Sequence, residues 1–151
     1  MKNKKQEYKN VTIHLENILD TEPQLSSISK MSIIASELYT KFNYWIFCGF
    51  YILSNNFLEI GPYHGRILPC SRISIGNGVC GTSAKKKKTI IINDVSKIQY
   101  YISCDSETNS EIVIPIFSNK EVIAVLDIDS PTLNDFNEID KKFLERICLL
   151  I

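Results

Sequence analysis

Hydrophobic residues recur at helical spacing in the first third of the chain. Two such sets predict amphipathic helices, one over residues 5–19 and one beginning near Leu25, separated by a break at Thr21-Glu22-Pro23. The apolar positions are Val11, Leu15, Ile18 and Leu19 in the first helix, and Leu25, Ile28, Met31, Ala35, Leu38 and Phe42 in the second. Stripes of this kind indicate helices that pack against a core.

The pattern changes to that of strands from residue 44. Residues 44–53 are rich in aromatic and branched side chains, and the turn Ser54-Asn55-Asn56 leads into a second strand over residues 57–60. Gly61-Pro62 is predicted to end that strand. Residues 63–71 are predicted to form a loop that carries Cys70, and residues 72–75 a short strand.

Residues 76–81 match the pattern G-x-G-x-x-G. A dinucleotide fold needs this pattern between the first strand and helix of a parallel unit. Here it follows antiparallel hairpins and precedes a short helix, residues 79–87, so it predicts a tight turn and a helix start. Cys80 lies at that helix start, where free N–H groups and the helix dipole lower the pKa of a thiol. A strand over residues 89–92 and a loop or short helix over residues 93–103 follow.

The stretch from Cys104 to Asp129 predicts a hairpin with chemistry at its open end. Cys104 lies on a polar loop, Glu111 begins a strand, and residues 118–120 form the turn. The returning strand is apolar until it ends in Asp127 and Asp129, which share one face. A hairpin brings its first and last residues together, so a thiol is expected beside three carboxyl groups.

The chain closes with a predicted helix. Asn134, Asp135 or Asn137 can cap it, and its apolar face is predicted to hold Phe136, Ile139, Phe143, Ile147 and Leu150. The element order predicts an α+β fold in one domain, residues 1–151, with a central antiparallel sheet flanked by N- and C-terminal helices.

Composition fits this fold and excludes several partners. The chain has 151 residues, 44% hydrophobic and 23% charged, with 17 basic and 17 acidic residues. A net charge of zero favours neither nucleic acid nor an anionic membrane as partner. The N-terminus lacks the apolar run of a signal peptide, and no apolar stretch is long enough to span a bilayer. We expect a cytoplasmic protein.

The five cysteines indicate thiol chemistry more than a disulfide framework. Their number is odd, no C-x-x-C pair occurs, and the chain has only two histidines, so a closed zinc site is not expected. Cys48 and Cys148 are predicted to be inert core residues. Redox or nucleophilic chemistry remains open for the other three.

Several motifs in order and at matching spacing resemble the free methionine-(R)-sulfoxide reductases, enzymes built on a GAF domain. These motifs are Pro69-Cys70-Ser-Arg72-Ile73, Gly78-Val-Cys80-Gly81-Thr82, Ser103-Cys104-Asp105, Ser110-Glu111-Ile-Val-Ile-Pro115 and Leu126-Asp127-Ile-Asp129-Ser130-Pro131. The resemblance is dense over about two thirds of the chain and looser over the two leading helices. It implies a GAF-like fold.

The resemblance also implies roles for individual residues. Cys104 would be the nucleophile, Cys70 the cysteine that forms the intramolecular disulfide, and Cys80 the third cysteine of the family pattern. Substrate contacts are implied for Glu111, Asp127, Asp129, Tyr51 and Phe47. The last of these departs from the family pattern Trp-x-Gly-Phe-Tyr, because the chain reads Phe47-Cys48-Gly49-Phe50-Tyr51 and its tryptophan is Trp45.

The implied reaction fits these residue types. A thiolate attacks the sulfoxide sulfur, a carboxylic acid kept protonated among other carboxyls protonates the departing oxygen, and a second thiol converts the sulfenic acid to a disulfide. The expected partners are free methionine sulfoxide and a thioredoxin-type reductant fed by NADPH. No metal or organic cofactor is expected, and a homodimer is left open.

Two alternatives come from other functional classes. The first is a GAF module that binds a small molecule or senses redox state without turnover, although three spaced cysteines would be surplus in a binder. The second is a thiol hydrolase, whose base could only be the distant His64. The residues alone do not give the stereochemistry or the division of labour among the carboxylates.

Overall fold

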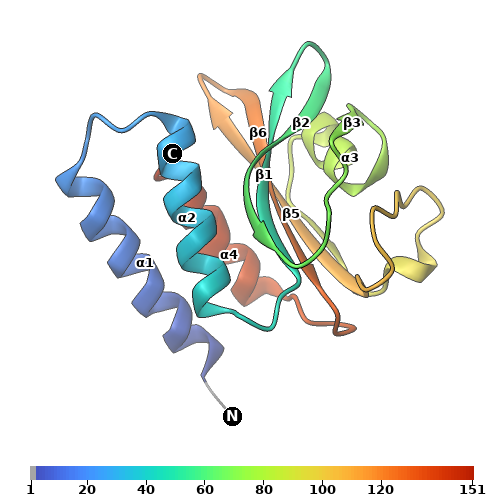
Figure 1. Ribbon diagram of the computed structural model, residues 1–151, viewed down its shortest axis with the longest axis horizontal. Helices are drawn as coiled ribbons and strands as arrows, with labels where there is room; N and C mark the ends of the chain where they lie inside the picture. The colour runs from blue at the N-terminus through green and yellow to red at the C-terminus, as the bar shows by residue number, and fades with distance from the viewer. Residues whose placement is uncertain (1–2) are drawn as a thin grey trace.

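The apolar runs of the middle of the chain form one six-stranded sheet in the computed structural model, which describes residues 3–151 (Figure 1). The elements are α1 (Lys4–Thr21), α2 (Ser27–Lys41), β1 (Phe47–Ser54), β2 (Phe57–Gly65), β3 (Arg72–Ser74), α3 (Gly78–Lys86), β4 (Ile90–Ile92), the 3-10 helix η1 (Val95–Lys97), β5 (Ser110–Ser118), β6 (Glu121–Ser130) and α4 (Glu138–Cys148). The strand order is β3-β2-β1-β6-β5-β4, and every neighbouring pair is antiparallel.

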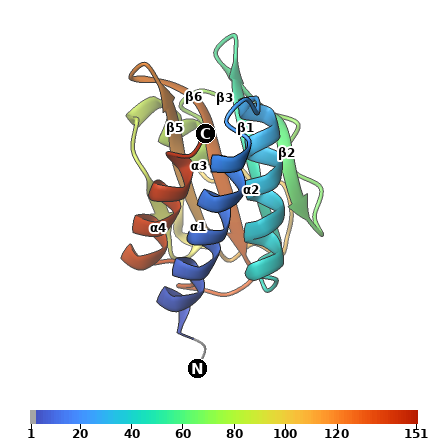
Figure 2. The ribbon, with the colours of Figure 1, turned by 90° about the vertical axis from the view of Figure 1, so that its left-hand side faces the viewer.

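The two faces of the sheet carry different layers. Helices α1, α2 and α4 lie side by side over one face, as Figure 2 shows from that side, whereas α3 and the long loops cover the other. The predicted α+β fold, with its antiparallel sheet between N- and C-terminal helices, is confirmed. Within residues 3–151 no helix is both long and apolar enough to cross a membrane.

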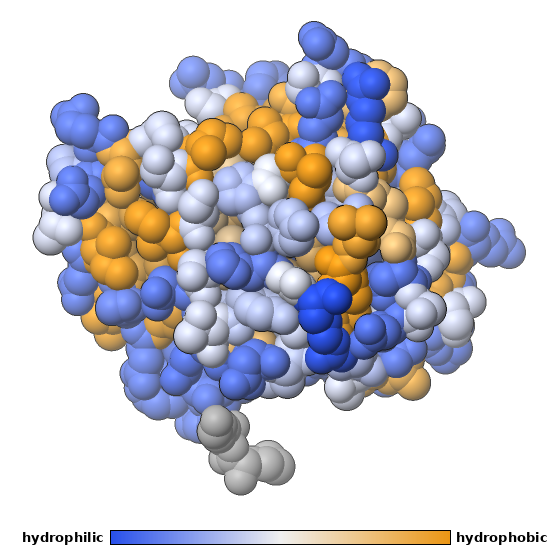
Figure 3. Space-filling view, in the orientation of Figure 1, coloured by the Kyte–Doolittle hydropathy of each residue, from blue (hydrophilic) through white to orange (hydrophobic). Residues whose placement is uncertain are grey.

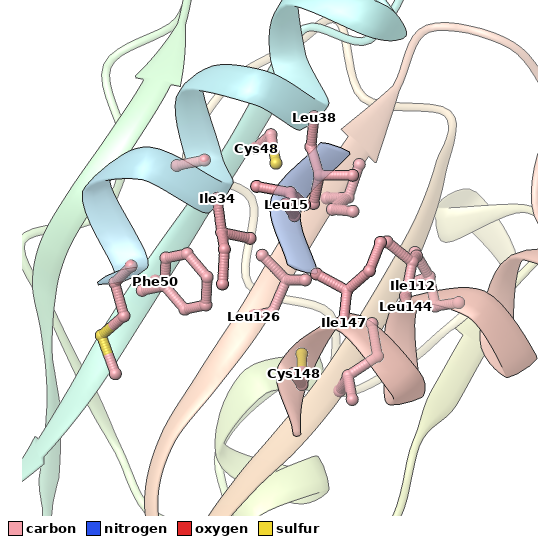
Figure 4. Close-up of a cluster of buried hydrophobic side chains, with 14 of the residues drawn as sticks. Leu15, Ile34, Leu38, Cys48, Phe50, Ile112, Leu126, Leu144, Ile147 and Cys148 are labelled. Atoms are coloured by element: carbon pink, nitrogen blue, oxygen red, sulfur yellow. The ribbon is translucent and has the colours of Figure 1, made fainter. Parts of the chain in front are cut away.

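A core lies on each side of the sheet, because successive residues of a strand point to opposite faces. Toward the helices, Phe50 and Leu126 pack with Leu15, Ile34 and Ile147 (Figure 4). The opposite core contains Phe47, Tyr51, Leu58, Ile73, Val79, Cys80, Val113 and Val125. Burial on both faces explains why the central strands read as nearly continuous apolar runs.

Contacts with Asp140 join the first helix to the last. The Tyr8 hydroxyl donates to Asp140 Oδ1 at 2.8 Å, and Lys4 Nζ lies 2.7 Å from the same oxygen. The other oxygen of Asp140 accepts from the backbone N–H of Asn137, which completes a capping box at the start of α4. The buried carboxylate therefore has a partner for each oxygen.

Two boundaries predicted from the sequence are wrong. Strand β1 begins at Phe47, since residues 44–46 are still part of the connection from α2. Strand β2 continues through Pro62 to Gly65, because β3 pairs only with its first three residues and the β1–β2 register shifts between Gly49 and Tyr51. Proline is tolerated at such an irregular edge.

The predicted apolar face of the closing helix is also partly wrong. Ile139 is 40% exposed, whereas Leu144, which was not predicted, is fully buried. Phe136 is buried but precedes the helix, which begins at Glu138 after the Asn137 cap. The buried face is therefore set by Leu144 and Ile147.

Candidate active site

The three carboxyl groups predicted at the hairpin lie together on the face opposite helices α1, α2 and α4. Strand pairing places Glu111 of β5 directly across from Asp129 of β6. Asp127 lies two residues earlier on the same face of β6, and all three side chains are buried. The expected proximity of these residues is confirmed by the register of the hairpin.

Gly49 leaves room for the aromatic side chains next to Asp127. It is the β1 residue paired with Asp127, and a Cβ atom there would lie 2.7 Å from Cζ of Phe47. The Phe47 ring therefore occupies space that a side chain at residue 49 would need, and it stacks on Tyr63 with ring centroids 5.5 Å apart. Tyr51 follows on the same face of β1, so an aromatic wall borders the carboxyl groups.

Burial favours the protonated form of the three carboxyl groups. Desolvation raises the pKa of Glu111 and of Asp129 well above the ordinary values, and the charge of Asp127 raises both further. Desolvation also raises the pKa of Asp127 to about 7, although hydrogen bonds from Cys80 and Glu111 act in the opposite direction. At neutral pH the cluster therefore contains protonated carboxylic acid, as the proposed proton transfer requires.

Cys80 does not have the lowered pKa that its helix start predicted. Its side chain is buried, and desolvation raises the pKa of the thiol well above its ordinary value, with further contributions from the charges of Asp127, Glu111 and Asp129. The helix-start argument considered only α3 and left out the acidic strand ends on which α3 packs. Cys80 is therefore a neutral thiol beside Glu111 and Asp127.

A disulfide joins Cys70 to Cys104 beside this cluster, with Cα atoms 5.3 Å apart. Cys70 lies on the loop between β2 and β3, and Cys104 on the long connection before β5. Loops so far apart in sequence can approach without any change in the sheet. The pairing implied by the resemblance is therefore present in the structure, whereas the roles of the two thiols remain a proposal.

Asp105 fixes the shape of the Cys104 loop. One carboxylate oxygen accepts from the backbone N–H groups of Glu107 and Thr108 at 2.6 and 2.9 Å, and the other from the Thr108 hydroxyl at 2.8 Å. Glu107 in turn pairs with Arg66 of the opposite loop at 2.8 Å. No role is predicted for Asp105 or Arg66 from the sequence, although an aspartate that accepts from backbone N–H groups two and three residues later is a common turn feature.

Cys104, the carboxyl groups and the aromatic wall line a small cavity of about 30 Å³. Its lining includes every predicted site residue except Cys70. Tyr101, Ile102, Ile67 and Val79 also line it and were not predicted. Loop residues of this kind carry no periodic signal that would place them at a site.

The cluster can also be considered as a metal site. Cys80 Sγ and carboxylate oxygens of Glu111 and Asp127 all lie within 4.8 Å of one another, and such donors can hold a borderline cation. The sequence predicts a reaction without metal or organic cofactor, and that remains a prediction.

Cys48, Cys148 and His64 lie away from the site. Cys48 and Cys148 are buried on the helix side of the sheet, as predicted for inert core residues. His64 pairs with Cys48 across β1 and β2, and its ring lies 6.1 Å from that of Tyr39 on α2. It is therefore on the wrong face to act as a base for Cys104, which argues against a thiol hydrolase.

Comparison with known proteins identifies the family. Residues 30–151 match the model of the GAF domain. The chain is 45% identical to free methionine-R-sulfoxide reductase of Saccharomyces cerevisiae over 107 residues, which span 68% of this chain and 59% of the yeast protein. It is 37% identical to free methionine-R-sulfoxide reductase of Escherichia coli over 123 residues, 82% of this chain and 72% of that protein. The chain belongs to the GAF-domain family of free methionine-R-sulfoxide reductases.

A solved member of this family has the same fold. The X-ray structure of free methionine-R-sulfoxide reductase from Neisseria meningitidis, in complex with its substrate, has a TM-score of 0.93 and 32% identity, covering 99% of this chain and 89% of the other. The resemblance predicted from the cysteine and carboxylate motifs is therefore confirmed, together with membership of an enzyme family.

Proposed function

We propose that this chain reduces free L-methionine (R)-S-oxide to methionine, with Cys104 as the nucleophile. The observation that carries the proposal is the Cys70–Cys104 disulfide at the edge of a cavity lined by three buried carboxyl groups. A structural disulfide would not need acidic neighbours, whereas sulfoxide reduction needs a thiol, a proton donor and a second thiol in one place.

The carboxyl groups suit a free amino acid. Its ammonium group can donate to buried carboxylate oxygens, which offsets the cost of desolvating the charge. Asp127 Oδ1 is buried and has no hydrogen-bond partner among residues 3–151, so it is available to such a donor. Phe47 and Tyr51 present aromatic surface to the thioether side chain.

The disulfide state corresponds to the enzyme after turnover. The cavity of about 30 Å³ is far too small for methionine sulfoxide. The substrate therefore binds the dithiol form, after the Cys70 and Cys104 loops have separated. Loops that carry few core contacts can move in this way without disturbing the sheet.

Reaction begins with attack of the Cys104 thiolate on the sulfoxide sulfur. A protonated carboxyl of the cluster gives its proton to the sulfoxide oxygen, and the oxygen passes to Cys104 as a sulfenic acid while methionine is released. Cys70 then attacks the sulfenic acid sulfur, which forms the disulfide and releases water. A thioredoxin-type dithiol, itself reduced through NADPH, restores the two thiols by exchange.

The test is a steady-state assay with thioredoxin, thioredoxin reductase and NADPH. We expect turnover of free methionine (R)-sulfoxide, with little activity on the S diastereomer or on a peptide-bound sulfoxide. Cys104→Ser should abolish turnover, whereas Cys48→Ser, a matched change of a core thiol, should retain it. Binding of methionine sulfoxide without any turnover would instead support a non-catalytic GAF module.

A further inference from the structure

Large exposed apolar side chains lie within a few residues of each cysteine of the disulfide. Leu68, two residues before Cys70, is 81% exposed, and Tyr100 and Ile102, just before Cys104, are 48% and 41% exposed. Figure 3 shows apolar surface next to a strongly hydrophilic side chain over the loop between β2 and β3. Single exposed apolar residues need no explanation, but three gathered at one redox bond indicate a contact surface.

The two sulfurs of the bond differ in their surroundings. Cys104 lines the cavity with Glu111, Asp127 and Asp129, whereas Cys70 does not. In thiol–disulfide exchange the incoming thiolate approaches a sulfur in line with the bond that breaks, so attack on Cys104 would have to come through this small cavity. Attack on Cys70 keeps the thiolate on the outer side of the bond.

We propose that a thioredoxin-type dithiol protein docks on the apolar rim formed by Leu68, Tyr100 and Ile102 and attacks the Sγ of Cys70. This inference rests on the proposed function, because it is the catalytic cycle that needs a reductant. The partner must present an apolar surface around its own thiol, because Arg66 and Glu107, charged residues of the two loops that carry the rim, already pair with each other.

Reduction of the Cys70–Cys104 disulfide takes two thiol–disulfide exchange steps. The first thiolate of the reductant forms a bond to Cys70 Sγ, the Cys70–Cys104 bond breaks, and Cys104 leaves with the electron pair. The protonated carboxyls beside Cys104 can supply the proton that this departing thiolate takes up. The second thiol of the reductant then attacks the mixed disulfide, which releases reduced Cys70 and oxidises the reductant to its own disulfide.

The test measures reduction of the disulfide directly and needs no methionine sulfoxide. Leu68→Asp should lower the rate constant for reduction by thioredoxin about tenfold, because a carboxylate would face an apolar partner. Its reduction by dithiothreitol should match that of the unsubstituted protein. Leu149→Asp is the matched control, since Leu149 is 85% exposed on the C-terminal side of α4 and should leave both rates unchanged.

Trapping identifies the attacked sulfur. Thioredoxin that lacks its second cysteine should accumulate as a mixed disulfide, and mass spectrometry should place it on the Cys70 peptide. A mixed disulfide on Cys104, or a Leu68→Asp variant that thioredoxin reduces as fast as Leu149→Asp, would overturn the proposal. Failure of the steady-state sulfoxide assay alone would count against the proposed function and would leave this result unaffected.

Discussion

Replacing Asp127 with asparagine should change how the stability of the protein depends on pH. Asp127 is buried, and burial raises the pKa of its carboxyl from 3.8 to about 7. Between these values the folded protein binds more protons than the unfolded chain, so the free energy of unfolding falls as pH rises. Asparagine cannot ionise, and the variant lacks this contribution.

The size of the effect follows from the two pKa values. With 3.8 unfolded and about 7 folded, the free energy of unfolding of the unsubstituted protein should fall by about 2.5 kcal/mol relative to Asp127→Asn between about pH 5 and about pH 8. The charge of Asp127 also raises the pKa of Glu111 and Asp129 in the folded protein. The Asp127→Asn variant lacks that charge, so its free energy of unfolding should depend still less on pH.

Urea unfolding over this pH range measures the difference. The chain has a single tryptophan, the fully buried Trp45, whose fluorescence reports loss of the core. Both proteins are compared with the disulfide intact, and Asp20→Asn, which alters an exposed carboxylate on α1, is the matched control. Any pH-independent effect of the amide shifts the whole curve and does not alter its slope. Parallel curves for Asp127→Asn and the unsubstituted protein would refute the reasoning.

Three further predictions test other parts of the account. Cys70→Ser should still form about one methionine per chain, since the first step needs no second thiol, but should lose steady turnover with thioredoxin; sustained turnover would move the resolving role elsewhere. Asp127→Asn should also raise KM for free methionine sulfoxide about tenfold through loss of a charged acceptor, and an unchanged KM would place the ammonium group elsewhere. Tyr8→Phe should lower the free energy of unfolding by about 2 kcal/mol, because it removes a buried hydrogen bond to the Asp140 carboxylate; a change below about 0.5 kcal/mol in denaturant unfolding would contradict this.

The hairpin of the active site was predictable because its signals are local. Turn residues at 118–120 set the pairing of β5 with β6, and side-chain alternation then places Glu111 opposite Asp129. The extent of β2 was not predictable in the same way. Pro62 normally ends a strand, and its tolerance depends on how far β3 extends along the edge, which is a tertiary property.

The environment of Cys80 shows why a local rule can fail at a site. A helix start favours a thiolate, but the thiol lies against the carboxyl groups of β5 and β6, and burial with acidic neighbours has the larger effect. The packing of Phe47 beside Asp127 likewise depends on Gly49 of a strand far away in sequence. Such features come from packing between elements, so the sequence pattern of one element does not contain them.

The most direct test of the central claim is a single turnover without reductant. The fully reduced protein is mixed with excess free methionine (R)-sulfoxide, and methionine and thiols are counted. The account predicts about one methionine per chain, the loss of two thiols, and a Cys70–Cys104 disulfide in the peptide map. It also predicts that Cys104→Ser forms no methionine. Methionine formation by that variant, or none from the unsubstituted protein, would contradict the account.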